Sequence, residues 1–254
     1  MPMVEEWWKA MPPVTRGYVS LAVLTTAATT LELITPLKLY LNWKLVFTRG
    51  EMWRLATTFL FFGTLSIDFL FHMFFIYRYS KDLERNSFRG RTADFLYMVL
   101  FGAALLLMLS PLFPHVIFFS FSLSFMMVYV WARRNAHQVM SFFGVITFTA
   151  PYLPWFLVAF SYMLGGSLVK DLMGVFVGHV YYYLKDVYPR MTGVQVLKTP
   201  KVLHWLVGNE NSNDVPRNHG RELFQQRMAA VGANDGWGQG RNLDGPRGNE
   251  QAQR

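Results

Sequence analysis

The chain has 254 residues, of which 52% are hydrophobic, 17% aromatic and only 16% charged. Soluble domains carry about a quarter charged residues, so this composition indicates that lipid is the solvent for much of the chain. The absence of cysteine excludes disulfides and thiolate metal sites. The net charge of +8 does not indicate nucleic acid as a partner, because the basic residues fall mainly between apolar segments, where they set membrane orientation.

Residues 1–16 are amphipathic and end near the Pro12-Pro13 pair. Their apolar residues, which include Trp7 and Trp8, recur at helical spacing, and the pattern predicts a short helix in the membrane interface. A helix end packed on a soluble domain is the alternative. No convincing small-x-small cleavage site precedes the next loop, so we interpret the following apolar stretch as a retained signal anchor rather than a cleaved signal peptide.

Six segments approach the roughly 20 apolar residues that a membrane-spanning helix requires. They lie at residues 17–35, 56–77, 95–112, 116–132, 149–163 and 168–184. Several are short, and the fifth contains Pro151 and Pro154, whose freed carbonyls neighbouring helices or water must satisfy. We therefore predict an all-α membrane protein with a six-helix domain over residues 17–190.

The distribution of positive charge predicts the orientation. The fourth loop begins with Arg133-Arg134, whereas residues 111–115 between the third and fourth segments carry no Lys or Arg. The second loop is also basic, with Arg78, Lys81, Arg85, Arg89 and Arg91. The positive-inside rule places these two loops, and with six spans both termini, in the cytosol. The first loop argues against this assignment, since it carries Lys38, Lys44, Arg49 and Arg54.

Asp68 and His72 stand four residues apart in the second segment, on one helical face. Ionisable groups within a membrane are costly and usually face a bundle interior or a water-filled cavity. A functional role in a hydrated cavity and a structural hydrogen-bonded pair both stay open. We expect no metal site here, because no further His or carboxylate has suitable spacing.

Two short motifs lie elsewhere in the membrane domain. Trp53 and Arg54 stand in the first loop just before the second segment, a combination common at membrane boundaries, and taken alone they are interpreted as an interface anchor. Gly174 and Gly178 form a small-xxx-small motif, which allows another helix to approach closely. The motif is followed at once by His179.

The fourth segment contains Ser120, Ser122 and Ser124, which an intramembrane serine protease could pair with His179. A nucleophilic serine needs a base within reach and an oxyanion hole, which flanking glycines help to shape. No glycine flanks these serines. We therefore interpret them as small packing residues and do not expect proteolysis.

Residues 191–254 are polar and rich in Gly, Asn, Gln and Arg, a composition that cannot bury enough surface to fold alone. We predict a flexible cytosolic tail, with a short helical piece near residues 221–228. Within it, residues 237–243 combine an aromatic residue, two glycines and a leucine, which is typical of a short linear binding motif.

Together these motifs resemble the Derlin family, the inactive rhomboid relatives of the endoplasmic reticulum membrane. The resemblance covers residues 1 to 190, resumes in the tail and follows the family's order of motifs. The matching stretches are Met52–Leu55, Asp68–Phe75, Tyr77–Tyr79, Ala150–Trp155 and Gly174–His179.

The resemblance implies a rhomboid-like bundle of six helices without catalytic activity and without a cofactor. The family's Trp-Arg pair matches Trp53 and Arg54, and its GxxxG motif matches Gly174 and Gly178. The tail stretch is similar to the family's box for docking a hexameric segregase AAA ATPase. Its defining positions are Trp237, Gly238, Gly240 and Leu243.

The resemblance also implies a role in endoplasmic-reticulum-associated degradation, in which misfolded substrates return to the cytosol across a locally thinned bilayer. A hydrophilic cavity between the second and sixth helices would include Asp68, His72 and His179. A multispanning RING ubiquitin ligase complex would mark the substrate and the ATPase would pull it. The alternatives are an adaptor that recruits the ATPase without forming a passage, and a residual intramembrane protease. Homo- and hetero-oligomers both stay open.

Overall fold

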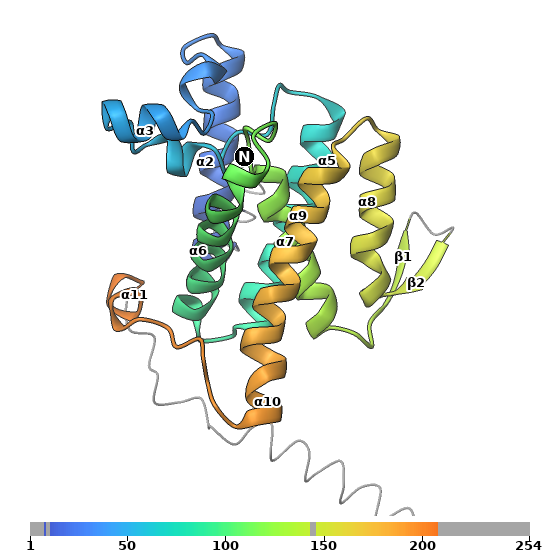
Figure 1. The fold of residues 1–254 in the computed structure, drawn as a ribbon. Helices are drawn as coiled ribbons and strands as arrows, with labels where there is room; N and C mark the ends of the chain where they lie inside the picture. The colour runs from blue at the N-terminus through green and yellow to red at the C-terminus, as the bar shows by residue number, and fades with distance from the viewer. Residues whose placement is uncertain (1–7, 9–10, 143–145, 208–254) are drawn as a thin grey trace, which may run out of the picture. The chain divides into compact units, whose positions relative to one another are not determined.

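In the computed structural model the described residues are Trp8, 11–142 and 146–207, and they are mostly helical (Figure 1). The first helix, α2 (Pro13–Thr30), begins with a proline, whose missing amide hydrogen is not needed in a first helical turn. It ends five residues before the predicted boundary at residue 35. Glu32 adopts a positive φ of 57°, and this left-handed conformation turns the chain out of the helix.

The first loop contains three short helical elements. They are η1 (Pro36–Lys38), α3 (Trp43–Arg49) and α4 (Arg54–Thr57). The side chain of Asn42 caps α3 by accepting a hydrogen bond from the Leu45 amide (3.3 Å), and Gly50 ends it at a φ of 70°.

The second predicted span needs correction. Helix α5 (Ile67–Phe75) begins after Ser66, whose side chain accepts a hydrogen bond from the Phe69 amide (3.2 Å), so residues 58–66 are not helical. The carbonyls of Thr58 and Phe61 instead accept hydrogen bonds from Phe119 and Ser120, at the start of a later helix. The predicted second loop is largely helical, because two π-helical turns, η2 (Ile76–Ser80) and η3 (Leu83–Ser87), continue α5.

The remaining helices correspond to the third to sixth predicted segments. They are α6 (Thr92–Leu109) with η4 (Ser110–Leu112), α7 (Ser120–Arg134), η5 (Ala150–Tyr152) with α8 (Leu153–Met163), and α9 (Leu168–Tyr182) with η6 (Tyr183–Val187). An antiparallel hairpin of β1 (Val139–Phe142) and β2 (Ile146–Thr149), in which Val139 pairs with Thr149, was not expected from the sequence.

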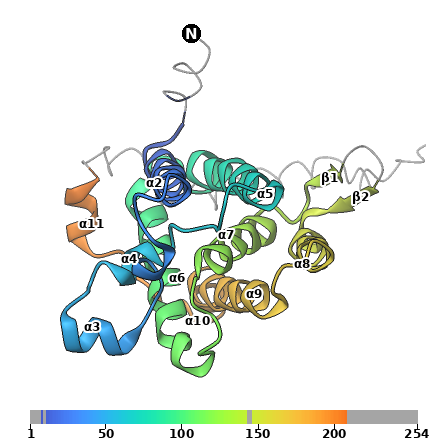
Figure 2. The same ribbon diagram turned by 90° about the horizontal axis from the view of Figure 1, so that it is seen from above.

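Helix α7 lies at the centre of the bundle. All residues from Leu123 to Ala132 are buried, and α7 contacts α5, α6, α8 and α9. In the view from above, α7 lies between α5 and α9, with α8 beside it (Figure 2). A helix that is apolar all round requires neighbours on every side, so α7 organises the surrounding helices.

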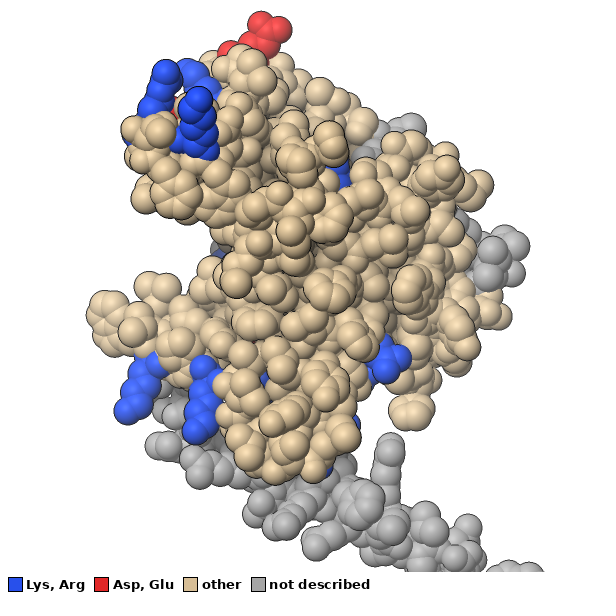
Figure 3. All heavy atoms as spheres, viewed as in Figure 1, with Lys and Arg blue, Asp and Glu red and all other residues tan. Residues whose placement is uncertain are grey.

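Among the described residues, Thr92–Leu112 is the helix that is both long and apolar enough to cross a membrane, with a mean hydropathy of 2.2. The other five spans stay a prediction. Lys and Arg atoms gather toward two ends of the face in Figure 3, and the band between them is largely uncharged.

Secondary structure extends beyond the expected domain boundary at residue 190. Helices α10 (Tyr188–Thr192) and α11 (Lys201–Leu206) follow α9, and α11 contacts α6. The predicted helical piece at residues 221–228 lies outside the described residues.

Candidate functional site

Two glycines of α9 form a close contact with α7. A Cβ atom built on Gly174 would collide with the Ser122 carbonyl oxygen and would lie 2.7 Å from Phe125 Cβ. A Cβ atom on Gly178 would lie 3.0 Å from Tyr129 Cβ and 3.1 Å from the Met126 carbonyl oxygen. The glycines therefore let α9 lie against α7 backbone to backbone.

His179 lies on this same α7–α9 contact. Its Nδ1 atom is 2.7 Å from the hydroxyl oxygen of Tyr129, and the two rings meet edge to face. Farther toward the C-terminal ends, the Arg134 guanidinium of α7 donates two hydrogen bonds to the carboxylate of Asp186 in η6, at 2.8 and 3.0 Å. These polar contacts tie the ends of α7 and α9 together.

The three serines of α7 donate hydrogen bonds to backbone carbonyl oxygens. Ser120 donates to Phe61 (2.5 Å), and Ser122 donates to Lys170 (2.7 Å). Ser124 donates within its own helix, to Ser120 and Phe121. The hydroxyls thus stabilise helix contacts, and the hydrogen bond of His179 goes to a tyrosine.

A small, partly open cavity lies on the other side of α7, between α5, α7 and α8. Its polar residues are one from each helix, His72, Ser124 and Ser161. The apolar part of its wall consists of Phe71, Phe75, Phe125, Val128, Leu157, Phe160 and Leu164. The cavity therefore combines an apolar, aromatic wall with a few polar groups, as ligand-binding cavities commonly do.

The structure corrects the expected membership of this cavity. His72 lines it and is buried, with its ring 4.3 Å from the Phe121 ring between centroids. His179 does not line it, because α7 separates α5 from α9 and holds His179 on the opposite contact. Asp68 lies in α5, and its side chain lies outside the described part of the structure.

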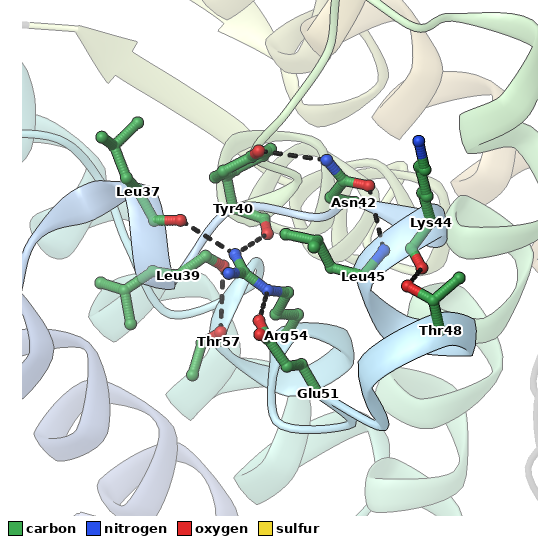
Figure 4. A network of polar contacts seen from close by, with 10 residues as sticks. All are labelled: Leu37, Leu39, Tyr40, Asn42, Lys44, Leu45, Thr48, Glu51, Arg54 and Thr57. Carbon is green, nitrogen blue, oxygen red and sulfur yellow. Dashed lines mark hydrogen bonds and ion pairs between the residues drawn. The ribbon is translucent and has the colours of Figure 1, made fainter.

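Arg54 organises the first loop (Figure 4). Its guanidinium is buried and donates to the carbonyl oxygens of Leu37 (2.9 Å) and Tyr40 (3.0 Å). It also binds the Glu51 carboxylate at 2.6 Å and lies over the Tyr40 ring. The fork of Arg54 thus binds acceptors at three positions of the loop, which a simple interface anchor would not do.

The neighbouring Trp53 behaves differently. Its side chain is exposed, and the loop presents further exposed apolar side chains. These are Leu33, Leu37, Phe47 and Met52. Within the Trp-Arg pair, Arg54 therefore holds the loop together, whereas Trp53 faces outward.

Sequence reasoning missed Glu84 of η3, which caps the N-terminus of α2. Its buried carboxylate accepts hydrogen bonds from the amides of Val14 (3.1 Å) and Thr15 (2.9 Å) and from the Thr15 hydroxyl (2.7 Å). Exposed amides and a positive dipole at a helix N-terminus favour an anion there. The only sequence signal was an acidic residue within a basic loop.

Two further acidic residues within the helical bundle were missed. Asp171 is buried in the first turn of α9, inside the sixth predicted span. Asp82 accepts a hydrogen bond from the indole nitrogen of Trp131, which joins the helical continuation of α5 to α7. An acidic residue in an apolar segment was the available signal for Asp171.

The tail box lies outside the described residues, as does most of the predicted N-terminal helix. Among the described side chains, no group of three His, Asp or Glu residues is arranged to hold a metal ion.

Comparison with known proteins identifies close relatives. Residues 11–201 match the model of the Der1-like family. The chain is 54% identical over 218 residues to Derlin-2.2 of Zea mays, covering 82% of this chain and 88% of the maize protein. It is 52% identical over 217 residues to Derlin-2.2 of Arabidopsis thaliana, with coverage of 82% and 89%. A probable derlin-2 homolog of Dictyostelium discoideum is 43% identical over 212 residues, with coverage of 81% and 84%.

Proposed function

The chain belongs to the Der1-like family, and we propose that it assists the return of misfolded proteins to the cytosol in endoplasmic-reticulum-associated degradation. In this proposal it is a multi-pass protein of the endoplasmic reticulum membrane with both termini in the cytosol. It performs no chemical step. It lowers the barrier that a polypeptide meets when it crosses the bilayer.

The cavity between α5, α7 and α8 carries this proposal. Helix α8 has 11 residues, which at 1.5 Å per residue is about 16 Å, roughly half of a hydrocarbon core of about 30 Å. A short span is accommodated by thinning of the surrounding bilayer. A substrate that enters beside α8 would therefore cross a shorter apolar distance.

The chemistry of the cavity lining suits contact with an extended polypeptide. His72, Ser124 and Ser161 offer hydrogen-bonding groups, and the aromatic wall accepts apolar side chains. A misfolded chain carries both kinds of group. In lipid its backbone amides would have no partner, and each unsatisfied group costs several kcal/mol, so even a few partners favour entry.

The first loop supports local thinning. Leu33, Leu37, Phe47 and Trp53 are exposed around the buried Arg54 network. Exposed aliphatic and aromatic groups suit the zone between headgroups and acyl chains. We propose that the loop lies in that zone on the lumenal side and draws lipid toward the short helices.

Force would come from outside the chain. We propose that the box at Trp237, Gly238, Gly240 and Leu243 docks the segregase AAA ATPase, and that a RING ubiquitin ligase complex marks the substrate. The rigid α7–α9 contact would keep the membrane domain in shape while the substrate is pulled.

Filling the cavity tests this proposal against the adaptor alternative. In cells that lack the endogenous protein, Ser161→Phe should slow clearance of a misfolded membrane substrate severalfold, while co-purification of the ATPase stays unchanged. Ser161→Ala, which leaves the cavity open, should clear normally. Normal clearance by a well-folded Ser161→Phe protein, combined with loss of clearance in Trp237→Ala, would favour an adaptor that forms no passage.

A further inference from the structure

The segment after α10 returns to the bundle and is held there by two hydrogen bonds. The Lys185 ammonium donates to the Leu197 carbonyl oxygen at 3.0 Å. The Thr199 hydroxyl donates to the carboxylate of Asp94, the third residue of α6. Helix α11 is thereby held against α6 close to the point where the apolar span Thr92–Leu112 begins.

One face of α11 is apolar and exposed. Val202, Trp205 and Leu206 are 70%, 83% and 65% exposed. Their spacing of three and four residues places them side by side on one helical face. A large tryptophan that exposes most of its surface to water is unfavourable, so this face requires a covering that the described residues do not supply.

Exposed basic residues lie close to α11 in the chain and directly before α6, which α11 contacts. Residues 188–206 contain Arg190, Lys198 and Lys201 and no Asp or Glu. Arg89 and Arg91, which directly precede α6, are exposed as well. A tryptophan-bearing apolar face flanked by Lys and Arg is typical of a helix that lies in the surface of a membrane containing anionic lipid.

The position of α11 distinguishes a membrane from a soluble partner. Only 28% of the apolar window of α6 is buried within the protein, so most of that helix is left for lipid. The lipid around α6 must end in headgroups near Thr92, which is where Thr199 and Asp94 hold the segment that leads into α11. The lipid surface of α6 is therefore continuous with the exposed face of α11.

We propose that α11 is an interfacial anchor, which inserts Val202, Trp205 and Leu206 into the headgroup boundary of an anionic cytosolic leaflet. Lys198 and Lys201 contact the lipid headgroups. The inference goes beyond the proposed role in degradation and depends only on the membrane placement of the chain.

The absence of cysteine allows a direct test with the full-length protein. Val202→Cys and, as a water-exposed control, His137→Cys are labelled with a polarity-sensitive fluorophore and reconstituted in phosphatidylcholine vesicles with 30% phosphatidylserine. Iodide quenching at Val202→Cys should be about threefold weaker than at His137→Cys, since an inserted label is shielded from water. Lipids that carry a nitroxide just below the headgroup should quench Val202→Cys strongly.

Equal iodide quenching at the two positions would overturn the proposal. Shielding of Val202→Cys without nitroxide quenching would also overturn it, because protein, such as a second copy of the chain, would then cover the face. Neutralisation in Lys198→Gln/Lys201→Gln should raise iodide quenching with phosphatidylserine and leave it unchanged in pure phosphatidylcholine. Equal effects in both lipids would contradict the anionic preference. Flotation of the vesicles after an alkaline wash reports membrane insertion separately, and clearance assays do not enter this test.

Discussion

The two sides of α7 are built differently. Toward α9 the helices meet at Gly174 and Gly178 so closely that backbone touches backbone, and hydrogen bonds continue the contact to Asp186. Toward α5 and α8 the helices leave a small, partly open cavity between them.

The difference indicates how one bundle can be rigid and still admit a substrate. A tight helix contact loses stability when side-chain volume is added or removed, whereas helices that leave a cavity between them are less sensitive to added volume. We therefore assign the α9 side to stability and the α5–α8 side to passage.

The largest effect should come from the tight side. Gly174→Leu places a side chain against the Ser122 carbonyl and Phe125, so we expect a loss of about 3 kcal/mol, the upper range for overpacking. The apparent melting temperature of the purified protein in detergent measures it. Gly17→Leu is the matched control, because a Cβ atom there meets nothing within 4 Å. Comparable losses in both variants would contradict a special α7–α9 contact.

Removal of the Glu84 cap should cause the next largest loss of stability. Glu84→Ala leaves the Val14 and Thr15 amides without their carboxylate, and hydrogen bonds to a charged group contribute about 1.5–3 kcal/mol. Hydrogen exchange at these two amides should accelerate, while Glu84→Gln, which keeps one acceptor oxygen, should lie in between. Unchanged exchange in Glu84→Ala would show that the cap does not hold this end of the bundle.

Substitutions of Arg54 and Trp53 should differ in their effect on the stability of the first loop. Arg54→Lys keeps the charge but loses the fork that binds the Leu37 and Tyr40 carbonyls, and we expect the loop to lose about 1–2 kcal/mol of local stability. Limited proteolysis of the first loop in detergent should speed up accordingly. Trp53→Ala, which removes an exposed side chain, should leave cleavage nearly unchanged. Equally faster cleavage in both variants would show that Trp53 and Arg54 act together as an interface anchor.

The smallest effect concerns the pair of Tyr129 and His179. Tyr129→Phe removes one neutral hydrogen bond at 2.7 Å, which should cost about 1 kcal/mol. The melting temperature should fall slightly, and Tyr152→Phe, at an exposed position, should have no effect. A loss as large as that of Gly174→Leu would mean that the hydrogen bond, rather than the glycine contact, secures α9.

Hydropathy located the apolar segments well, and α6 shows why. A long run of apolar residues has one stable backbone state in an apolar environment, the helix. The prediction of one helix over residues 56–77 was wrong, because the carbonyls of Thr58 and Phe61 accept hydrogen bonds from the start of α7. A partner some sixty residues away leaves no trace in a local pattern. The same applies to Glu84, whose amide partners lie 69 and 70 residues earlier.

Motifs indicated the kind of contact but not the partner. The glycine spacing predicted a close helix approach, yet only the structure identifies Ser122 and Tyr129 on α7 as what the glycines meet. The sequence left both a cavity role and a structural pair open for Asp68 and His72, and His72 lines a cavity that opens toward α8 rather than α9. Tertiary packing decides which helices contact each other, and the local patterns of a single sequence do not identify these partners.

Site-specific photocrosslinking tests the assignment of the α5–α8 side most directly. A photoreactive residue replaces Leu164, which lines the cavity and is 48% exposed, or its neighbour Met163, which is 82% exposed and is not among the lining residues. Both positions lie at the same end of α8. During clearance in microsomes we expect adducts with a misfolded substrate from position 164 and few from position 163. Equal adducts from both, or adducts from position 163 alone, would contradict passage through the cavity.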